Sequence, residues 1–404
     1  MTAKNKKIEQ AIILCAGKGT RIYPLTLTKP KPLLKICGKT LLEHNLNQLN
    51  GLVKEVILVI QYKGDMFEKF FGNKYKNLNI KYVWQGKNPL GTGDAAKKAS
   101  ILIKDRFLLL YGDDLYDKKD IEQCASKFPS ILLAKANNPS AFGQVITEKN
   151  LVKEIIEKPK KDVSDLVNTG VYFLPKSIFN FSIKKSSRKE YEFTDYIKNF
   201  IQTEKLYYKT AENWVPLSYI WNLLDANEFL LKNIQNKISG EIEKNCVIKG
   251  KVVIEKGSVI KSGVYIEGPV YIGKNCNIGP NCYLRKYTAI EDNCRIGQSV
   301  EIKNSIIGNK TNVAHLSYVG DSIIGDNCNL GAGTIISNIR HNFENIKTMV
   351  KGELIDTNRR KFGAVFGDGV KTGIGTLIYP GRKIWPENFT KPGEIVEKDI
   401  IFLN

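Results

Sequence analysis

A glycine-rich segment near the N-terminus carries two basic side chains in a pattern that suits phosphate binding. It runs from Leu14 to Leu34 with the sequence LCAGKGTRIYPLTLTKPKPLL. Gly17 and Gly19 allow backbone N–H groups to approach phosphate oxygens closely. Arg21 and Lys31 add positive charge that can neutralise an anionic substrate and a developing transition state. The segment therefore predicts a site for a phosphate-containing substrate.

A pair of glycines alone would also fit a dinucleotide-binding loop or a structural turn. Dinucleotide loops carry a third glycine at a fixed spacing, and none is present here. Thr20-Arg21 and then Pro30-Lys31-Pro32 follow instead. The full signature, G-x-G-T-R-x-x-P-L-T-x-x-x-P-K-P, resembles that of the sugar nucleotidylyltransferases.

The elements around this segment predict an α/β fold. Apolar runs such as IEQAIILCA, EVILVI and RFLLLYGDD alternate with amphipathic stretches over residues 8–135. This alternation favours a mainly parallel, Rossmann-like sheet with helices on both faces. Ligands bind such sheets beyond the carboxyl ends of the strands.

The resemblance continues in order along residues 8–230 and implies the site residues. Gln85 and the Leu90–Gly93 segment resemble the base-recognition region, and Asp113 resembles the metal-binding aspartate. The implied nucleotide contacts are Leu14, Ala16, Gly17, Gly19, Thr20, Gln85, Gly91 and Thr92. The implied sugar contacts are Gly143, Glu157 and Asn168.

In this family a sugar-1-phosphate attacks the α-phosphorus of a nucleoside triphosphate such as UTP or dTTP, and pyrophosphate leaves. The resemblance makes Arg21 and Lys31 the catalytic cations. It also implies Mg²⁺ held by Asp113 and a second ligand, for which we favour Asn222 over Asp225. We expect the glycine loop, the two cations and Asp113 to converge around a triphosphate.

The second half of the chain has a period of six. An aliphatic residue returns at every sixth position from 242 to 302, a period that fits neither a helix nor a flat strand. The pattern resumes after one-residue slips through Ile336 and again from Phe366 to Val396. It resembles the hexapeptide left-handed parallel β-helix, in which each face of a triangular prism takes one hexad. The aliphatic positions of the first run are Ile242, Ile248, Ile254, Ile260, Ile266, Ile272, Ile278, Leu284, Ile290, Ile296 and Ile302.

The eight cysteines form no C-x-x-C pair, so zinc binding and disulfides are disfavoured. Five of them follow a repeat aliphatic by four residues, a slot for small side chains inside the coil. These are Cys246, Cys276, Cys282, Cys294 and Cys328. We interpret them as core residues.

The segment from Ala314 to Thr334 contains HLSYVGD and resembles the acetyltransferase domain of bifunctional N-acetylglucosamine-1-phosphate uridylyltransferases. The resemblance makes His315 the general base that takes a proton from a sugar amine as the amine attacks acetyl-CoA. A lone histidine would more often be structural, but companions stand at matching spacings. The implied substrate contacts are Arg285, Lys303, Tyr318, Asn329, Asn338 and, through its backbone, Ala332.

Residues 337–362 break the period, which predicts a loop projecting from the prism. The loop is longer than in the bacterial enzymes, so Lys361 is our choice for a late phosphate contact and Lys347 the rival. The stretch DTNRRKFGAVFGDGVKTGIGT is closer to archaeal-type relatives. We expect residues 1–221 to form the nucleotidylyltransferase domain, 222–240 a linker helix and 241–404 the β-helix.

Two hypotheses for the function remain as alternatives to a bifunctional enzyme. The β-helix of a monofunctional nucleotidylyltransferase would serve assembly or regulation only, and a non-catalytic relative would lack the intact loop. The net charge of +20 suggests nucleic acid, but scattered lysines without a binding motif disfavour it. No apolar run is long enough for a membrane span, so we expect a cytoplasmic protein. The family resemblance implies a homotrimer.

Overall fold

The computed structural model describes residues 8–86, 90–136 and 138–401. The chain divides into two compact units. The first unit comprises residues 1–18 and 41–216, and the second comprises residues 19–40 and 217–404. The second unit thus includes most of the segment that is predicted to bind phosphate, a grouping that differs from the expected division at residue 221.

The first unit is built on a mixed sheet whose central strands are parallel. Strand β1 (Gln10–Leu14) lies between β4 (Glu55–Ile60) and β7 (Arg106–Tyr111) and is buried throughout. Continuous apolar runs suit such strands because both faces of the sheet are covered. The strand order is β10-β11-β13-β9-β12-β7-β1-β4-β6-β5. The other strands are β5 (Lys74–Tyr75), β6 (Leu78–Trp84), β9 (Ser130–Lys135), β10 (Gly143–Glu148), β11 (Leu151–Glu157), β12 (Leu166–Pro175) and β13 (Tyr207–Thr210).

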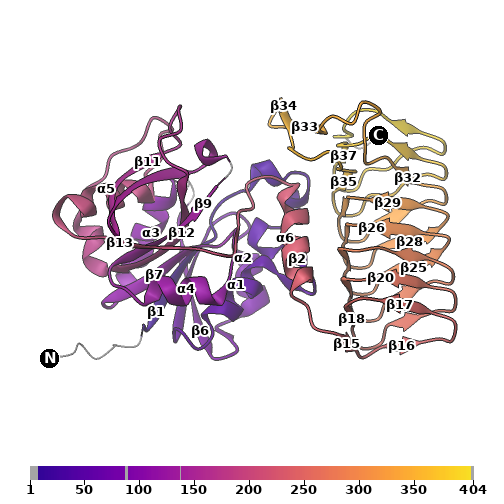
Figure 1. Cartoon of the computed structure of the whole chain (residues 1–404), viewed down its shortest axis with the longest axis horizontal. Coiled ribbons are helices and arrows are strands. Elements are labelled where there is room, and N and C mark those ends of the chain that lie inside the picture. The colour runs from indigo at the N-terminus through magenta and orange to yellow at the C-terminus, as the bar shows by residue number, and fades with distance from the viewer. Residues whose placement is uncertain (1–7, 87–89, 137, 402–404) are drawn as a thin grey trace. The chain divides into compact units, whose positions relative to one another are not determined.

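Helices flank this sheet, and in Figure 1 they are drawn in the indigo-to-magenta part of the chain. They are α1 (Leu41–Leu49), α2 (Asp65–Phe71), α3 (Thr92–Ala99), α4 (Lys118–Ala125) and α5 (Phe193–Thr203). Helix α3 presents Ala95, Ala96 and Ala99 to the core that contains Ile12 and Ile57. Small side chains let this helix lie close to the strands. A small antiparallel pair joins β8 (Leu115–Tyr116) to β14 (Trp214–Val215).

The second unit contains a parallel β-helix, as the period of six predicts. Its strands form three ladders in which each coil pairs with the next. The first ladder is β15 (Lys237–Ile238), β18 (Val252–Ile254), β21 (Val270–Ile272), β24 (Thr288–Ile290), β27 (Ile306–Ile307), β30 (Ile323–Ile324), β35 (Val365–Phe366) and β37 (Lys383–Ile384). The second is β16 (Glu241–Ile242), β19 (Val259–Ile260), β22 (Asn277–Ile278), β25 (Arg295–Gln298), β28 (Asn312–His315) and β31 (Asn329–Leu330). The third is β17 (Val247–Lys249), β20 (Tyr265–Glu267), β23 (Tyr283–Leu284), β26 (Glu301–Lys303), β29 (Tyr318–Gly320), β32 (Ile335–Ile336), β36 (Leu377–Ile378) and β38 (Ile395–Val396).

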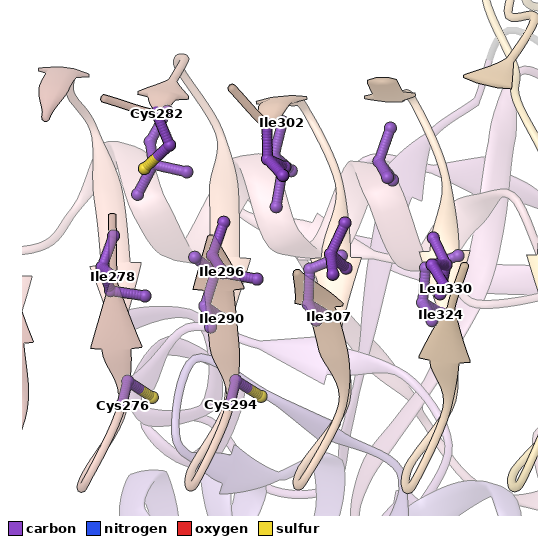
Figure 2. Close-up of a cluster of buried hydrophobic side chains, with 14 of the residues drawn as sticks. Cys276, Ile278, Cys282, Ile290, Cys294, Ile296, Ile302, Ile307, Ile324 and Leu330 are labelled. Atoms are coloured by element: carbon purple, nitrogen blue, oxygen red, sulfur yellow. The ribbon is translucent and has the colours of Figure 1, made fainter. Parts of the chain in front are cut away.

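The repeat aliphatics fill the interior of this prism, as Figure 2 shows for the column from Ile278 to Leu330. Cys276, Cys282, Cys294 and Cys328 are buried beside them, which confirms their interpretation as core residues. The aliphatic residues of the first coil are less buried, because this terminal coil has a neighbouring coil on one side only. Ile242 is 39% exposed, and Cys246 is only partly buried.

The linker helix is shorter than expected. Helix α6 runs from Asn222 to Lys232, and Lys237 and Ile238 already pair with Val253 and Ile254 in the β-helix. Backbone pairing with the next coil therefore replaces the expected last helical turns. The projecting loop contains a hairpin of β33 (Lys347–Val350) and β34 (Glu353–Asp356).

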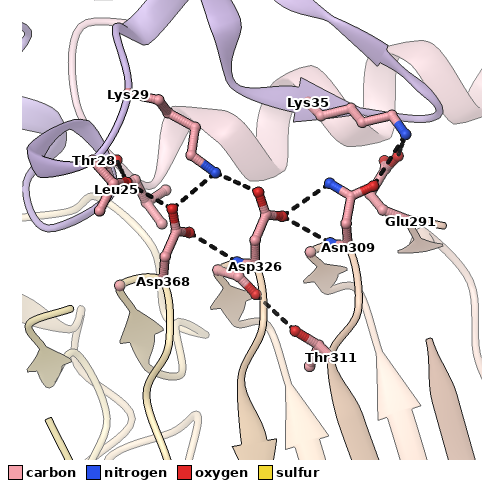
Figure 3. A network of polar contacts seen from close by, with 12 residues as sticks. Leu25, Thr28, Lys29, Lys35, Glu291, Asn309, Thr311, Asp326 and Asp368 are labelled. Carbon is pink, nitrogen blue, oxygen red and sulfur yellow. Dashed lines mark hydrogen bonds and ion pairs between the residues drawn. The ribbon is translucent and has the colours of Figure 1, made fainter. Parts of the chain in front are cut away.

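The segment of residues 19–40 folds into short turns and a hairpin held by carboxylates of the β-helix. Lys29 lies 2.9 Å from Asp368 and also pairs with Asp326. Figure 3 shows these contacts together with the bond of 2.6 Å from the Thr28 hydroxyl to Asp368. The turns are Thr20–Ile22, Leu25–Leu27 and Lys31–Leu33, and the hairpin joins β2 (Lys35–Ile36) to β3 (Lys39–Thr40).

No helix in the described ranges combines the length and the apolar character that crossing a bilayer requires.

Candidate active sites

The end of β1 places the start of the glycine loop beside Asp113 in the first unit. The backbone N–H of Gly112 donates to the carbonyl of Leu14 at 2.9 Å. A side chain at Gly112 would collide with Cys15, since its Cβ would lie 2.5 Å from the sulfur. Burial and the charge of Asp113 raise the pKa of the Cys15 thiol, so this sulfur is a neutral packing group.

The next two predicted residues continue this loop. Ala16 is buried, whereas a Cβ added at Gly17 would meet nothing within 4 Å. The backbone of Gly17 is thus accessible to a ligand, as phosphate binding by N–H groups requires.

The predicted base-recognition residues are linked by hydrogen bonds to one another and to their neighbours. The buried Gln85 donates from Nε2 to the carbonyl of Gly91 at 2.9 Å and to Asp94 at 3.0 Å. Gly91 has a φ of +100°, and an added Cβ would lie 2.5 Å from the carbonyl oxygen of Tyr191. The Thr92 hydroxyl accepts from the N–H of Phe193 at 3.0 Å. The glycine is therefore required by a tight backbone contact.

The predicted sugar contacts converge in the first unit. Gly143 and Glu157 are register partners on β10 and β11. A Cβ at Gly143 would lie 3.0 Å from Glu157 Oε2 and 3.8 Å from Asn168 Cβ. Asn168 donates to the Tyr172 hydroxyl at 2.6 Å and accepts from the N–H of Gly170 at 2.9 Å. These bonds fix the amide at the edge of a small polar cluster.

The sequence pattern missed Arg188, which joins this cluster. Its guanidinium lies 3.3 Å from Glu157 and 2.8 Å from Glu192. Burial raises the pKa of Glu157, while the charges of Lys158 and Arg188 oppose the rise. A charged loop residue gives no spacing signal for a partner 31 positions away, so only the fold reveals this contact.

The remaining residues of the glycine loop lie in the second unit. Gly19 has a φ of +62°, and a Cβ there would lie 3.3 Å from Lys31 Cβ, while Thr20 begins the following turn. Lys31 is buried and its ammonium donates to the carbonyl of Leu217. The exposed Arg21 lies over the Tyr219 ring, with Cζ 5.4 Å from the centroid. The expected convergence of these groups with Gly17 and Asp113 remains a prediction.

The candidate second metal ligands stand at the start of α6. Asn222 Oδ1 accepts from the N–H of Tyr219 at 2.9 Å, and its Nδ2 donates to Asp225 at 2.9 Å. Asp225 also pairs with Arg359 of the projecting loop. The metal role of Asn222 therefore stays a prediction.

The Mg²⁺ that the resemblance implies remains a prediction. No three His, Cys, Asp or Glu side chains gather as a metal site among the described residues. A hard carboxylate such as Asp113, together with substrate phosphates, is the arrangement that Mg²⁺ favours.

In the second unit, predicted acetyltransferase residues stack on consecutive coils. Lys303 and Gly320 are register partners, and Lys303 lies 3.3 Å from Asp321. Asn338 donates to Asp321 at 2.6 Å and to the Tyr318 hydroxyl at 3.1 Å. Burial, then the charge of Asp321, raises the pKa of Tyr318.

Arg285 belongs to the same face of the β-helix. It pairs with Glu301 at 2.8 Å, and its charge acts on Tyr318. Glu301 lies outside the sequence motifs, and Asp321 is the last residue of HLSYVGD, to which no role was assigned. Each partners a cation that is expected to bind phosphate.

His315 lies at a corner of the prism, exposed to solvent at the end of β28. Its carbonyl accepts from the N–H of Gly333 at 3.4 Å, which places the adjacent Ala332 on the coil next to it. Asn329 is exposed and pairs with Asn312 on the same ladder. The exposed His315 side chain is thus accessible to a substrate, as a general base requires.

The exposed Lys361 precedes Phe362, whose N–H donates to the carbonyl of Asn338 at 3.0 Å. Lys347, the rival, lies in the hairpin opposite Asp356. The choice of Lys361 over Lys347 as a phosphate contact remains a prediction.

Comparisons with known proteins find matches over both halves of the chain. The nucleotidyl transferase family model matches residues 10–233, and the model of the GMPPB C-terminal domain matches residues 266–388. A crystal structure described as a glucose-1-phosphate thymidylyltransferase from Bacillus anthracis aligns with a TM-score of 0.50 and 24% identity. The alignment covers 57% of this chain and 98% of that one, and it supports the fold of the first half.

Full-length relatives extend the match over both units. The bifunctional protein GlmU of Methanocaldococcus jannaschii is 42% identical over 394 residues, which is 96% of this chain and 95% of the relative. The bifunctional sugar-1-phosphate nucleotidylyltransferase/acetyltransferase of Sulfurisphaera tokodaii is 39% identical over 400 residues, covering 97% and 98%. The chain therefore belongs to the family of bifunctional sugar-1-phosphate nucleotidylyltransferase/acetyltransferases.

Proposed function

We propose that this protein transfers a nucleotidyl group from UTP or dTTP to a sugar-1-phosphate, with N-acetylglucosamine-1-phosphate as the favoured acceptor. The convergence of Gly143, Glu157 and Asn168 around one polar cluster carries the proposal. Carboxylate and amide groups of this kind bind sugar hydroxyls. The names of the full-length relatives support the same reaction.

The chemistry needs positioning and charge neutralisation more than covalent catalysis. The sugar phosphate oxygen attacks the α-phosphorus, and the bond to pyrophosphate breaks. In the proposal Arg21 and Lys31 offset the charge on the phosphates. Mg²⁺ bound through Asp113 would neutralise further phosphate charge.

Pyrophosphate release with UTP and N-acetylglucosamine-1-phosphate tests the proposal. We expect Lys31→Ala and Asp113→Ala to abolish release without unfolding the protein. The matched controls Lys135→Ala and Asp165→Ala remove an ion pair whose partners are 75% and 65% exposed, and we expect both to leave release unchanged. Near wild-type release by the Lys31 or the Asp113 variant would refute the assignment.

We propose acetyl transfer to an amino-sugar-1-phosphate as the reaction of the β-helix. The stacking of Lys303, Tyr318 and Asn338 on consecutive coils supports this. Arg285 and Lys303 would bind the phosphate, and Asn and Tyr side chains suit the sugar. His315 would take the proton from the amine as it attacks the acetyl carbonyl of acetyl-CoA, and the CoA thiol leaves.

Thiol release from acetyl-CoA with glucosamine-1-phosphate tests this second reaction. We expect His315→Ala to lose release and His341→Ala, in the exposed projecting loop, to retain it. Absence of thiol release by the wild-type protein, with nucleotidyl transfer intact, would favour the alternative in which the β-helix serves assembly or regulation.

The homotrimer belongs to the same proposal. Ile335, Leu377 and Ile395 are register partners on the third ladder and are 40%, 43% and 52% exposed. An outward apolar ladder favours burial against another copy of the chain. Sedimentation should give three times the chain mass of 45.5 kDa, and a monomeric mass would contradict the proposal. A cytoplasmic location is part of the proposal, and cell fractionation tests it.

A further inference from the structure

One short segment of the second unit contacts both proposed catalytic cations. The carbonyl of Leu217 accepts from the Lys31 ammonium, and the Tyr219 ring lies under the Arg21 guanidinium at 5.4 Å. The N–H of Tyr219 is fixed in turn by Asn222, at 2.9 Å. Residues 217–225, which we call the bracket, therefore bear on the orientation of both cations.

The bracket is held by the projecting loop of the β-helix. The Tyr219 and Trp221 rings stack with centroids 4.5 Å apart and planes inclined by 4°. Trp221 meets the Phe362 ring edge-on at a centroid distance of 6.5 Å. A second tie joins Asp225 to Arg359. An aromatic row thus runs from Arg21 to the end of the loop.

Phe362, at the far end of this row, is tightly packed. Phe362 is fully buried, and Trp221 is 5% exposed. The Phe362 N–H is bonded to the carbonyl of Asn338, which is itself one of the proposed acetyltransferase contacts. Packed aromatic rings with this much burial have few alternative rotamers. The row can therefore hold the guanidinium in one direction.

We propose that Tyr219 and Trp221 are positioning residues for Arg21, and that Phe362 and Arg359 of the projecting loop set their geometry. The inference rests on the proposed nucleotidyl transfer. It makes the loop that interrupts the hexad repeat a structural part of the nucleotidyl transfer site. Arg21 lies at the surface, so without the ring beneath it the guanidinium would sample many rotamers. Loss of one orientation of a catalytic group lowers kcat more than it weakens substrate binding.

The first test removes the stacked ring while keeping an apolar side chain at the position. We expect Trp221→Leu to lower kcat for pyrophosphate release about 10- to 100-fold, with the KM for UTP changed less than about threefold. Trp221→Phe keeps an aromatic ring and should recover most of the rate. Tyr265→Leu is the matched control, because it breaks another edge-on pair of the β-helix, with Tyr283 at 5.5 Å.

A double-mutant cycle separates positioning from a general loss of structure. If Trp221 acts through Arg21, Trp221→Leu should have little further effect in an Arg21→Ala background. Thiol release by the same preparation reports whether the β-helix is intact. Arg359→Gln disrupts only the tie to Asp225, and it should also lower kcat, by a smaller factor than Trp221→Leu.

The outcomes distinguish this inference from the proposed function. Wild-type protein without pyrophosphate release would refute the proposed function itself. Active wild-type protein with an unchanged kcat in Trp221→Leu would overturn the inference, as would a loss that remains fully additive with Arg21→Ala.

Discussion

Glu291 offers a test of how the segment of residues 19–40 is held in the second unit. Its side chain is buried beside Lys35, at 3.4 Å, and accepts from the N–H of Gly38 at 3.1 Å. Figure 3 shows the contact with Lys35 at the edge of the polar network. Burial raises the pKa of Glu291 to about 7, against the opposing charge of Lys35.

The sign follows from comparing the folded and unfolded chains. The folded carboxyl holds its proton up to about pH 7, whereas the unfolded carboxyl loses it near its ordinary pKa of 4.5. The folded chain therefore binds more protons between these values, and the free energy of unfolding falls as pH rises. Between about pH 5 and pH 8 the fall amounts to about 2.5 kcal/mol from this one group.

Glu291→Gln removes the titration while keeping the size of the side chain and an oxygen for the Gly38 N–H. We expect the variant to lack this part of the pH dependence when urea unfolding is followed at several pH values between about 5 and 8. Glu255→Gln is the control, because Glu255 pairs with Lys237 at 2.8 Å and that lysine is 56% exposed. Equal pH slopes for wild type and Glu291→Gln would refute the reasoning.

Three further predictions concern single positions. Asp321→Asn removes the carboxylate that contacts Lys303 and Asn338, so the KM for glucosamine-1-phosphate in thiol release should rise about 10-fold; an unchanged KM would contradict this. Gly91→Ala forces a Cβ to 2.5 Å from a carbonyl oxygen and should lower stability by about 1–3 kcal/mol in thermal unfolding, a result that a wild-type Tm would exclude. Ile278→Ala leaves a cavity in the prism, because Ile278 is fully buried. It should lower the unfolding free energy by about 2–5 kcal/mol, and a loss below about 1 kcal/mol would argue against close packing there.

The β-helix was predictable because its determinants are local and periodic. Every sixth residue must enter the prism, so the buried column from Ile254 to Ile302 follows from spacing alone. The exposed Ile242 shows where this rule ends, since a terminal coil lacks one neighbour. The length of the linker helix was not predictable. Residues after Lys232 have helical spacing, but Ile238 pairs with Ile254 in the β-helix instead.

Contacts between distant segments left no signal in the sequence. Lys29 and Asp326 are 297 positions apart, and scattered lysines give no indication of which carboxylate each one meets. The same holds for Arg188 with Glu157 and for Trp221 with Phe362. The motifs named single residues of each proposed site, whereas the fold shows the partners that orient them.

The most direct test of the account assays both reactions in wild type, Lys31→Ala and His315→Ala. The account predicts that Lys31→Ala loses pyrophosphate release and keeps thiol release, and that His315→Ala does the reverse. Retention of pyrophosphate release by Lys31→Ala, or of thiol release by His315→Ala, would contradict the assignment of one reaction to each set of residues.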